Sequence, residues 1–341
     1  MPSPTVDIIV PVWNKPFETR ACLAAILAHS PEARLIIIAN GSNRETELML
    51  EEFSEPLGER GLFISSDRNL GLIKAINMGL SRSDSDYAVI VRPHVEVTSG
   101  WLENLLEAAQ GGLATPLFRG DTIKVPKIAT GCSVIETFSL TFSALAIKGE
   151  LHMLIGGFNE EMDGAEWCLR DYMRRAWNRG YRTSVSSGSM LTCHPEVVFG
   201  SPERRREIEL SSSAHYQAHW GINRHFCIYF GKQAEAGSLA VPIDTILDGA
   251  RRGHTFTLLL HRRQAADFHR IGWDCLHTGI TLQKLPMLAP RRDLLKRLAS
   301  IKAAAPEAII VQCSADTLLS DSVTPIPLAE LSSLWEHTTE L

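Results

Sequence analysis

The strongest constraint on the fold is an alternation of two patterns in the first ninety residues. Short apolar runs rich in β-branched residues alternate with segments in which apolar residues recur at helical spacing. The expected strands are residues 6–12, 35–39, 62–64 and 87–91, and the expected helices are residues 19–29, 45–53 and 71–80. Strands that are apolar on both faces are typical of a parallel sheet covered by helices on both sides. The sequence therefore predicts a doubly wound α/β domain at this end of the chain.

The later part of the chain predicts a second, smaller domain. Residues 235–238 read Glu-Ala-Gly-Ser, a composition typical of a linker. Helical and strand patterns resume after them, with helices over 243–252 and 291–304 and strands over 255–260 and 308–313. We therefore expect a first domain over residues 5–232 and a small α/β accessory domain over residues 239–341.

Composition excludes several classes of protein. Of the 341 residues, 45% are hydrophobic and 21% are charged, as in ordinary globular proteins. The net charge of −5 argues against a nucleic-acid partner, and no apolar run approaches the ~20 residues of a membrane span. The N-terminus lacks the pattern of a secretory signal. Seven cysteines at irregular spacing predict free, mostly buried thiols and a cytoplasmic location. Composition leaves open whether the chain forms a homo-oligomer.

Polar and basic residues follow the predicted strands, at the edge where a doubly wound sheet binds ligands. Along the chain they are Pro11 to Asn14, Asn40-Gly41-Ser42, Asn69-Leu70-Gly71 with Lys74 and Asn77, and Arg92-Pro93-His94-Val95-Glu96. In this order and spacing they resemble the family 2 glycosyltransferases, which have the GT-A fold. Residues 155–160 and 179–182 resemble that family's acceptor-side segments. The resemblance covers roughly residues 5–200, and it implies a GT-A nucleotide-diphospho-sugar transferase fold for this domain.

The resemblance implies a nucleobase and ribose site after the first two strands. Asn40 would pair with the base edge through its amide, and the rim would be formed by Pro11, Trp13 and Asn14. The alternative is that Asn40 simply begins a tight turn with Gly41.

The resemblance also implies a diphosphate site at the start of the third helix. Asn69 and Gly71 precede free helical amides, which suit an anion together with Lys74, and Asn77 belongs to the same predicted site. The alternative is an ordinary helix N-cap.

The turn after the fourth strand departs from the family pattern. Family members place an acidic motif here that binds Mn²⁺ or Mg²⁺, ions that prefer oxygen ligands. This chain keeps Pro93 and has Arg92 and His94 on either side. The two could bind the diphosphate directly, or His94 could bind a transition metal together with His194. The third alternative is an inactive site.

The position of the general base also departs from the family pattern. The family uses an acidic residue just before a helix, and the corresponding position falls near residues 168–169, which are not acidic. Asp163 or Glu166 could serve instead. Asp171 occupies the later acidic position of the family's motif. The alternative is that Asp171 is only a surface charge beside neighbouring arginines.

Three functions follow from these patterns. The first is a glycosyltransferase that moves a sugar from a UDP-, GDP- or dTDP-sugar to an unknown acceptor with inversion, as in polysaccharide biosynthesis. The second is a catalytically degenerate GT-A domain that binds a sugar nucleotide or a partner protein. The third is a structural module in a surface-polysaccharide or protein-modification assembly.

Overall fold

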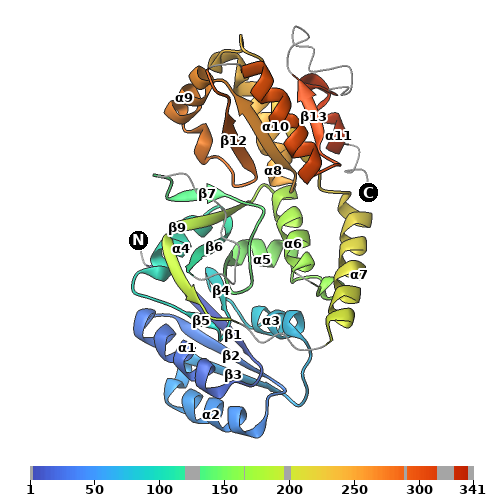
Figure 1. Cartoon of the computed structure of the whole chain (residues 1–341). Helices are drawn as coiled ribbons and strands as arrows, with labels where there is room; N and C mark the ends of the chain where they lie inside the picture. The colour runs from blue at the N-terminus through green and yellow to red at the C-terminus, as the bar shows by residue number, and fades with distance from the viewer. Residues whose placement is uncertain are drawn as a thin grey trace. The chain divides into compact units, whose positions relative to one another are not determined.

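The computed structural model divides into two compact units (Figure 1). It describes residues 3–119, 131–164, 166–195, 201–287, 290–312 and 326–336. The first unit holds the described residues up to 119 and between 139 and 219, and the second holds 131–138 and those from 220 onward. The division therefore falls earlier than the predicted boundary at residues 233–238, and a short earlier segment joins the second unit.

A mixed sheet forms the centre of the first unit, in the strand order β3-β2-β1-β4-β8-β6-β9-β5. Strands β1 to β4 are parallel, whereas β8 is antiparallel to both β4 and β6. The bounds predicted for β1 and β4 are confirmed. The strands are β1 (Val6–Val12), β2 (Arg34–Asn40), β3 (Gly61–Ser66), β4 (Tyr87–Val91), β5 (Val95–Glu96), β6 (Gly112–Arg119), β8 (Ala144–Lys148) and β9 (Arg182–Cys193).

Helices cover both faces of this sheet, as the apolar strands predict. Ile8 and Val10 of β1 share a buried core with Leu23 of α1. Ile9 points to the other face, where it meets Gly79 of α3. The helices are α1 (Pro16–His29), α2 (Arg44–Ser54), α3 (Leu72–Leu80), α4 (Trp101–Ala109), α5 (Gly149–Ile155), α6 (Trp167–Asn178) and α7 (Pro202–Trp220), with 3-10 turns η1 (Glu55–Arg60) and η2 (Glu160–Met162). Among the residues that the structure describes, no helix has the length and apolar character needed to cross a membrane.

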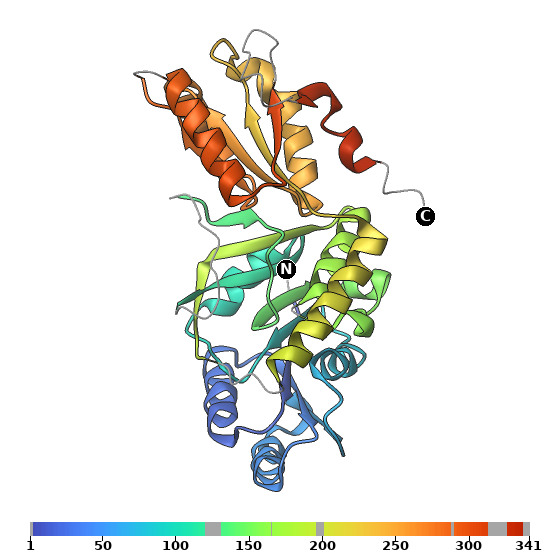
Figure 2. The same cartoon turned by 45° about the vertical axis from the view of Figure 1, so that its right-hand side comes forward.

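The second unit is a doubly wound parallel sheet with the strand order β12-β11-β10-β13-β14. Figure 2 shows helices on both sides of it. The central strand β10 (His225–Tyr229) lies in the predicted first domain, and this explains the earlier boundary. The other elements are β7 (Val134–Glu136), η3 (Ala236–Leu239), α8 (Ala240–Arg251), β11 (Thr255–Leu260), α9 (Arg262–Ile271), η4 (Trp273–Cys275), β12 (Ile280–Lys284), α10 (Pro290–Ala304), β13 (Ile309–Gln312), β14 (Ile326–Pro327), η5 (Leu328–Glu330) and α11 (Ser333–Glu336).

A disulfide within the second unit corrects the prediction of free thiols. Cys132 and Cys275 are bonded, with a sequence separation of 143 and 5.9 Å between their Cα atoms. The pairing has no local sequence signal because only the fold brings the two segments together. The cytoplasmic location was predicted from free thiols, and the disulfide removes this support. The other described cysteines, Cys22, Cys168, Cys193 and Cys227, are free and buried as predicted, and Cys313 lies outside the described residues.

Candidate functional site

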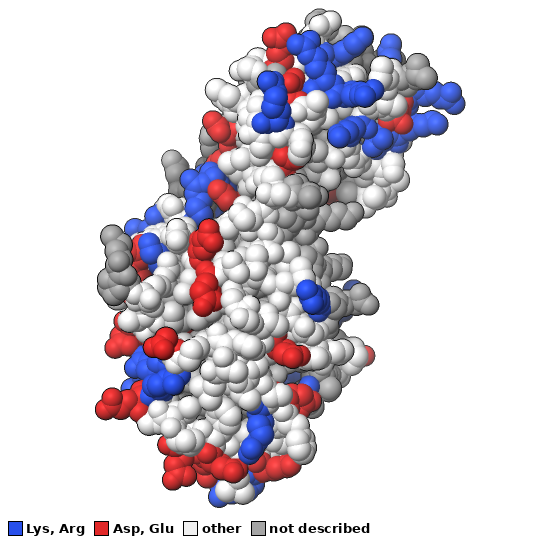
Figure 3. All heavy atoms as spheres, turned by 90° about the vertical axis from the view of Figure 1, so that its left-hand side faces the viewer, with Lys and Arg blue, Asp and Glu red and all other residues white. Residues whose placement is uncertain are grey.

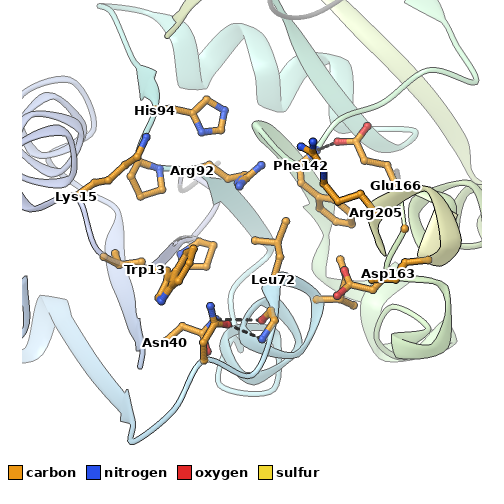
Figure 4. A pocket seen from close by; sticks show the side chains of 18 of the residues that line it. Trp13, Lys15, Asn40, Leu72, Arg92, His94, Phe142, Asp163, Glu166 and Arg205 are labelled. Atoms are coloured by element: carbon orange, nitrogen blue, oxygen red, sulfur yellow. Dashed lines mark hydrogen bonds between the residues drawn. The ribbon is translucent and has the colours of Figure 1, made fainter. Parts of the chain in front are cut away.

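A cavity of about 910 Å³ lies in the first unit, where the strands β1, β2 and β4 end (Figure 4). Its volume is in the range of small-molecule sites. Its walls come from the loops after these strands, the start of α3, the segments around residues 142 and 163–166, and the first turns of α7. The predicted site residues that line it are Pro11, Trp13, Asn40, Asn69, Gly71, Arg92, His94, Asp163 and Glu166. The remaining predicted residues, Asn14, Lys74, Asn77, Asp171 and His194, are not among its lining residues.

The Asn40 amide is used within the protein. Its Nδ2 donates to Asn69 Oδ1 and to the Gly71 carbonyl, both at 3.1 Å. Its Oδ1 accepts from the Leu70 N–H at 2.9 Å. The side chain is therefore a clamp that holds the β3–α3 loop against the end of β2. Both amide hydrogens are engaged, so a nucleobase could reach only the second lone pair of Oδ1.

The Asn40-Gly41 turn is close-packed for the same reason. Gly41 has a φ of 64°, and a Cβ at this position would lie 2.1 Å from the Arg68 carbonyl carbon. The turn thus needs glycine both for its backbone conformation and for the contact with the β3–α3 loop.

The loop after β1 adopts an unusual backbone at the cavity. Asn14 and Lys15 both have a φ of 59°, a region that residues with a side chain rarely occupy. The Asn14 N–H donates to Ser42 Oγ at 2.9 Å, and Asn14 Oδ1 accepts from the Asn43 N–H at 2.8 Å. Asn14 therefore ties the β1 and β2 loops together, and the next residue, Lys15, lines the cavity beside Trp13.

Two predicted site residues of α3, Lys74 and Asn77, contact the segment that follows α5. Asn77 Nδ2 donates to the Phe158 carbonyl at 2.9 Å and to Glu160 Oε1 at 3.1 Å, and Asn77 Oδ1 accepts from the Phe158 N–H at 2.9 Å. Lys74 Nζ lies 3.8 Å from Glu160 Oε2. In the structure, Asn77 fixes the segment that follows α5, and Lys74 has a carboxylate partner.

The turn after β4 presents a neutral imidazole and a guanidinium to the cavity. His94 is 8% exposed, and its Nε2 lies 3.1 Å from Ser143 Oγ. Burial, followed by the charges of Arg92 and Lys15, lowers the pKa of His94 to about 3. The ring is therefore uncharged at neutral pH, and Arg92 and Lys15 supply the positive charge at this end of the cavity.

The residues at this turn do not fit a Mn²⁺ or Mg²⁺ ion. A hard divalent cation needs several oxygen ligands, whereas the turn offers a cation on one side of Pro93 and an imidazole on the other. Glu96, which follows on β5, is exposed and lies 3.4 Å from His194 Nε2. Across the described parts of the chain, no group of three or more His, Cys, Asp or Glu residues could hold a metal ion. The pairing of His94 with His194 at a transition metal stays a prediction.

The three predicted carboxylates have different surroundings. Asp163 faces the cavity, and the protein atoms around it withhold water from its ionised form, which raises its pKa to about 6. Glu166 Oε1 accepts from Thr141 Oγ1 at 2.8 Å and from the Phe142 N–H at 3.1 Å. Asp171 is buried, lies outside this cavity and accepts from Arg175 Nε at 2.8 Å. Asp163 therefore combines access to the cavity with a pKa near neutrality.

A chain of side-chain contacts of 2.8–3.4 Å links the turn after β4 to the start of α6. The hydroxyls of Ser143 and Thr141 lie 3.4 Å apart. Thr141 donates to Glu166, and Ser143 contacts His94. Glu166 has a φ of 61° at the N-cap of α6, so these contacts hold it in a strained backbone conformation. Glu166 and His94 therefore support one wall of the cavity together.

Sequence reasoning missed three of the cations that line the cavity. Lys15 follows β1 directly, and Arg205 and Arg206 come from α7. Figure 4 shows Arg92 and Arg205 reaching into the cavity from opposite walls. Within the described part of the chain, Lys15, Arg205 and Arg206 make no ion pair with a carboxylate. The basic run of residues 204–206 was the only sequence signal for the two arginines, because α7 is remote from the strand ends.

The position of α7 over the cavity depends on a close backbone contact. The Gly164 N–H donates to Ser212 Oγ at 3.0 Å. A Cβ on Gly164 would lie 2.7 Å from the Ile208 carbonyl oxygen. Because Gly164 lies next to Asp163, this contact brings the arginines of α7 and the carboxylate to the same cavity.

Comparison with known proteins confirms the predicted family resemblance. Residues 7–124 match the family described as Glycosyl transferase family 2. The "Probable N-acetylgalactosaminyltransferase 6" of Caenorhabditis elegans is 27% identical over 162 residues, which are 46% of this chain and 24% of that protein. The "Putative polypeptide N-acetylgalactosaminyltransferase 13" of Drosophila melanogaster is 31% identical over 125 residues, which are 31% of this chain and 22% of that protein. The chain thus spans about a quarter of the length of these relatives.

A solved structure confirms the fold. The crystal structure of GalNAc-T7 with UDP, GalNAc and Mn²⁺ is similar with a TM-score of 0.54 and 15% identity, over 64% of this chain and 48% of that chain. At this identity the similarity establishes the fold, and the chain has the predicted GT-A architecture.

Proposed function

We propose that the cavity of the first unit binds a nucleoside diphospho-sugar and that this unit transfers the sugar to an acceptor hydroxyl. The observation that carries the proposal is the set of cations Lys15, Arg92 and Arg205 in a cavity at the carboxyl ends of β1, β2 and β4. Ligands of such sheets bind at this edge. The names of the two relatives contain N-acetylgalactosamine, and the similar solved structure holds UDP and GalNAc, so UDP-N-acetylgalactosamine is the first donor to test.

In this proposal, the diphosphate is bound by side chains. A guanidinium pairs with phosphate oxygens through two parallel hydrogen bonds, and Arg92 and Arg205 would approach the group from two walls. Lys15 adds a third positive charge. Cations fixed in advance stabilise the charge that develops on the leaving nucleoside diphosphate. The nucleobase would then lie against Trp13 and Pro11, with Asn40 and Asn69 holding the loop beneath it.

Asp163 is the proposed general base. In this scheme it takes the proton from the acceptor hydroxyl while the hydroxyl oxygen forms a bond with the anomeric carbon. The bond from that carbon to the diphosphate breaks, and its electron pair leaves with the nucleoside diphosphate. A carboxylate with a pKa of about 6 is better matched to this proton transfer than an ordinary one. Attack from the side opposite the leaving group inverts the anomeric carbon.

The roles of the other predicted residues follow from their contacts. Glu166 is the second candidate base, but its Oε1 accepts two hydrogen bonds from the protein. Asn14, Asn77 and Asp171 are proposed to support the site through the loops and helices that they hold. The acceptor would be a hydroxyl of a saccharide or a peptide, so polysaccharide biosynthesis and a cytoplasmic location are retained as parts of the proposal.

One observation favours the alternative of binding without catalysis. The turn that carries acids in the family carries Arg92 and His94 here, and a cationic site can bind a diphosphate tightly without releasing it. This alternative predicts donor binding without any release of UDP.

The test is calorimetric titration with UDP-N-acetylgalactosamine and with uridine. Arg205→Gln should weaken binding of the sugar nucleotide roughly tenfold or more, since a charged hydrogen bond contributes ~1.5–3 kcal/mol. The matched control is Arg204→Gln, which changes the neighbouring arginine of α7 that does not line the cavity. Uridine lacks phosphate, so its affinity should be the same in all three proteins.

Two outcomes would count against the proposal. The first is equal loss of affinity in the Arg204 and Arg205 variants, and the second is the absence of any binding by the unmodified chain. Release of UDP in the presence of acceptor hydroxyls separates transfer from simple binding.

A further inference from the structure

The second unit has a basic surface at the carboxyl edge of its parallel sheet. We call this surface the basic edge and define it by Lys232, Arg262, Arg263, Lys284, Arg291 and Arg292, all of which are exposed. Figure 3 shows lysine and arginine side chains gathered on the second unit, at the upper end of the view. The chain as a whole is acidic, with a net charge of −5, so this gathering is a local feature.

The register of the sheet brings these residues together. Leu260, the last residue of β11, lies opposite Lys284, the last residue of β12. Arg262 and Arg263 begin α9 immediately after β11, and α10 begins close after β12. Arg262 Nη1 lies 3.0 Å from the sulfur of Met287, in the segment between β12 and α10. This contact connects the start of α9 to the segment that precedes α10.

The acidic residues of these two helices do not neutralise the basic edge. Asp293 pairs with Arg297 at 2.6 Å, and Asp267 pairs with Arg270 at 2.8 Å. Each acid is thus engaged by an arginine further along its own helix that is not part of the basic edge. Glu235 is exposed near Lys232 and offsets one charge. Among the residues of this edge that the structure describes, a positive excess remains.

Exposed apolar side chains lie among these cations. Met287 is 71% exposed and contacts Arg262, and Leu295 is 40% exposed. Leu295 lies three and four residues after Arg292 and Arg291 on α10, which places the three on one side of the helix. Cations around exposed aliphatic side chains are typical of proteins that lie on an anionic membrane surface. Single-stranded nucleic acid sites instead use aromatic stacking platforms, and no exposed aromatic residue lies among the described residues of the basic edge.

We propose that the basic edge binds the surface of an anionic lipid bilayer, with Met287 and Leu295 entering the headgroup region. Each basic residue close to an anionic surface strengthens partitioning roughly fivefold. Removing three of the six charges should therefore weaken partitioning by about 100-fold. The attraction is electrostatic, so added salt should weaken it as well.

The experiment measures co-sedimentation of the full chain with vesicles. One set is phosphatidylcholine alone, and the other is an equimolar mixture of phosphatidylcholine and phosphatidylserine. The test variant is Arg263→Gln/Arg291→Gln/Arg292→Gln, in which three exposed arginines of the basic edge are neutralised. The matched control neutralises three exposed arginines of the first unit, Arg60→Gln/Arg82→Gln/Arg179→Gln.

We expect binding to the mixed vesicles only, lost in the test variant and kept in the control. Met287→Ser should reduce vesicle binding without changing the affinity for a single-stranded oligonucleotide, which measures charge alone. The proposal is overturned by equal binding to both vesicle types or by equal behaviour of the two triple variants. Oligonucleotide binding that exceeds vesicle binding and ignores Met287→Ser would assign the edge to nucleic acid instead.

Discussion

Replacing Asn40 with alanine distinguishes two roles of its side chain. The side chain either holds the β3–α3 loop in place or binds the edge of the nucleobase. The side chain is 4% exposed and makes three hydrogen bonds to the β3–α3 loop. Each such bond contributes about 1 kcal/mol net. Water can restore part of the loss because Asn69 is exposed, so Asn40→Ala should lower the free energy of unfolding by about 2–3 kcal/mol. Asn178→Ala, which removes an exposed amide at the end of α6, is the matched control and should change little.

Two assays on the same protein decide between the two roles. Urea unfolding followed by circular dichroism gives the stability, and calorimetry gives the affinities for UDP and GDP. A clamp predicts a destabilised protein in which both affinities fall by a similar factor, because the loop beneath the nucleotide is loosened. An unfolding free energy within about 0.5 kcal/mol of the unmodified chain, together with a changed preference between UDP and GDP, would show that Asn40 contacts the nucleobase instead of holding the loop.

Two further predictions concern the base and the disulfide. Asp163→Asn should reduce turnover by about 100-fold or more with little change in donor affinity. In the unmodified chain, turnover should fall as the pH drops through about 6, because the proton-accepting form is the ionised carboxylate; a profile that is flat between pH ~5 and ~7 would remove Asp163 from this role. Cys132→Ser opens a loop that spans 143 residues and should lower the stability of the second unit by about 2–5 kcal/mol. Unfolding of the second unit that is the same with and without a thiol reductant would contradict this.

Much of the first unit could be predicted because its strands are apolar throughout. The bounds of β1 and β4 were correct since each run is fully buried and ends at a turn. By contrast, α9 and β12 of the second unit had no predicted counterpart. Few residues of α9 are buried, and β12 has no fully buried residue, so neither carries a continuous apolar signal.

The candidate site was predictable only in part, for a related reason. Residues that follow parallel strands meet at one edge, so Trp13, Asn40 and Arg92 were expected to gather, and all three line the cavity. The orientation of the Asn40 amide depends on its hydrogen-bond partners in the folded chain. The sequence around Asn40 would be the same whether the amide contacts a ligand or holds the neighbouring loop, so the sequence could not decide between these roles. Arg205 reaches the cavity from a helix that comes more than a hundred residues after β4, and only tertiary packing brings it there.

In the proposed function, side-chain cations rather than a divalent metal bind the diphosphate of a sugar nucleotide. Titration of UDP-N-acetylgalactosamine into the full chain, first with a chelator and then with excess Mn²⁺, tests it most directly. If side-chain cations bind the diphosphate, the sugar nucleotide binds in the chelator, and Mn²⁺ leaves its affinity unchanged. Binding that appears only after Mn²⁺ is added would contradict it.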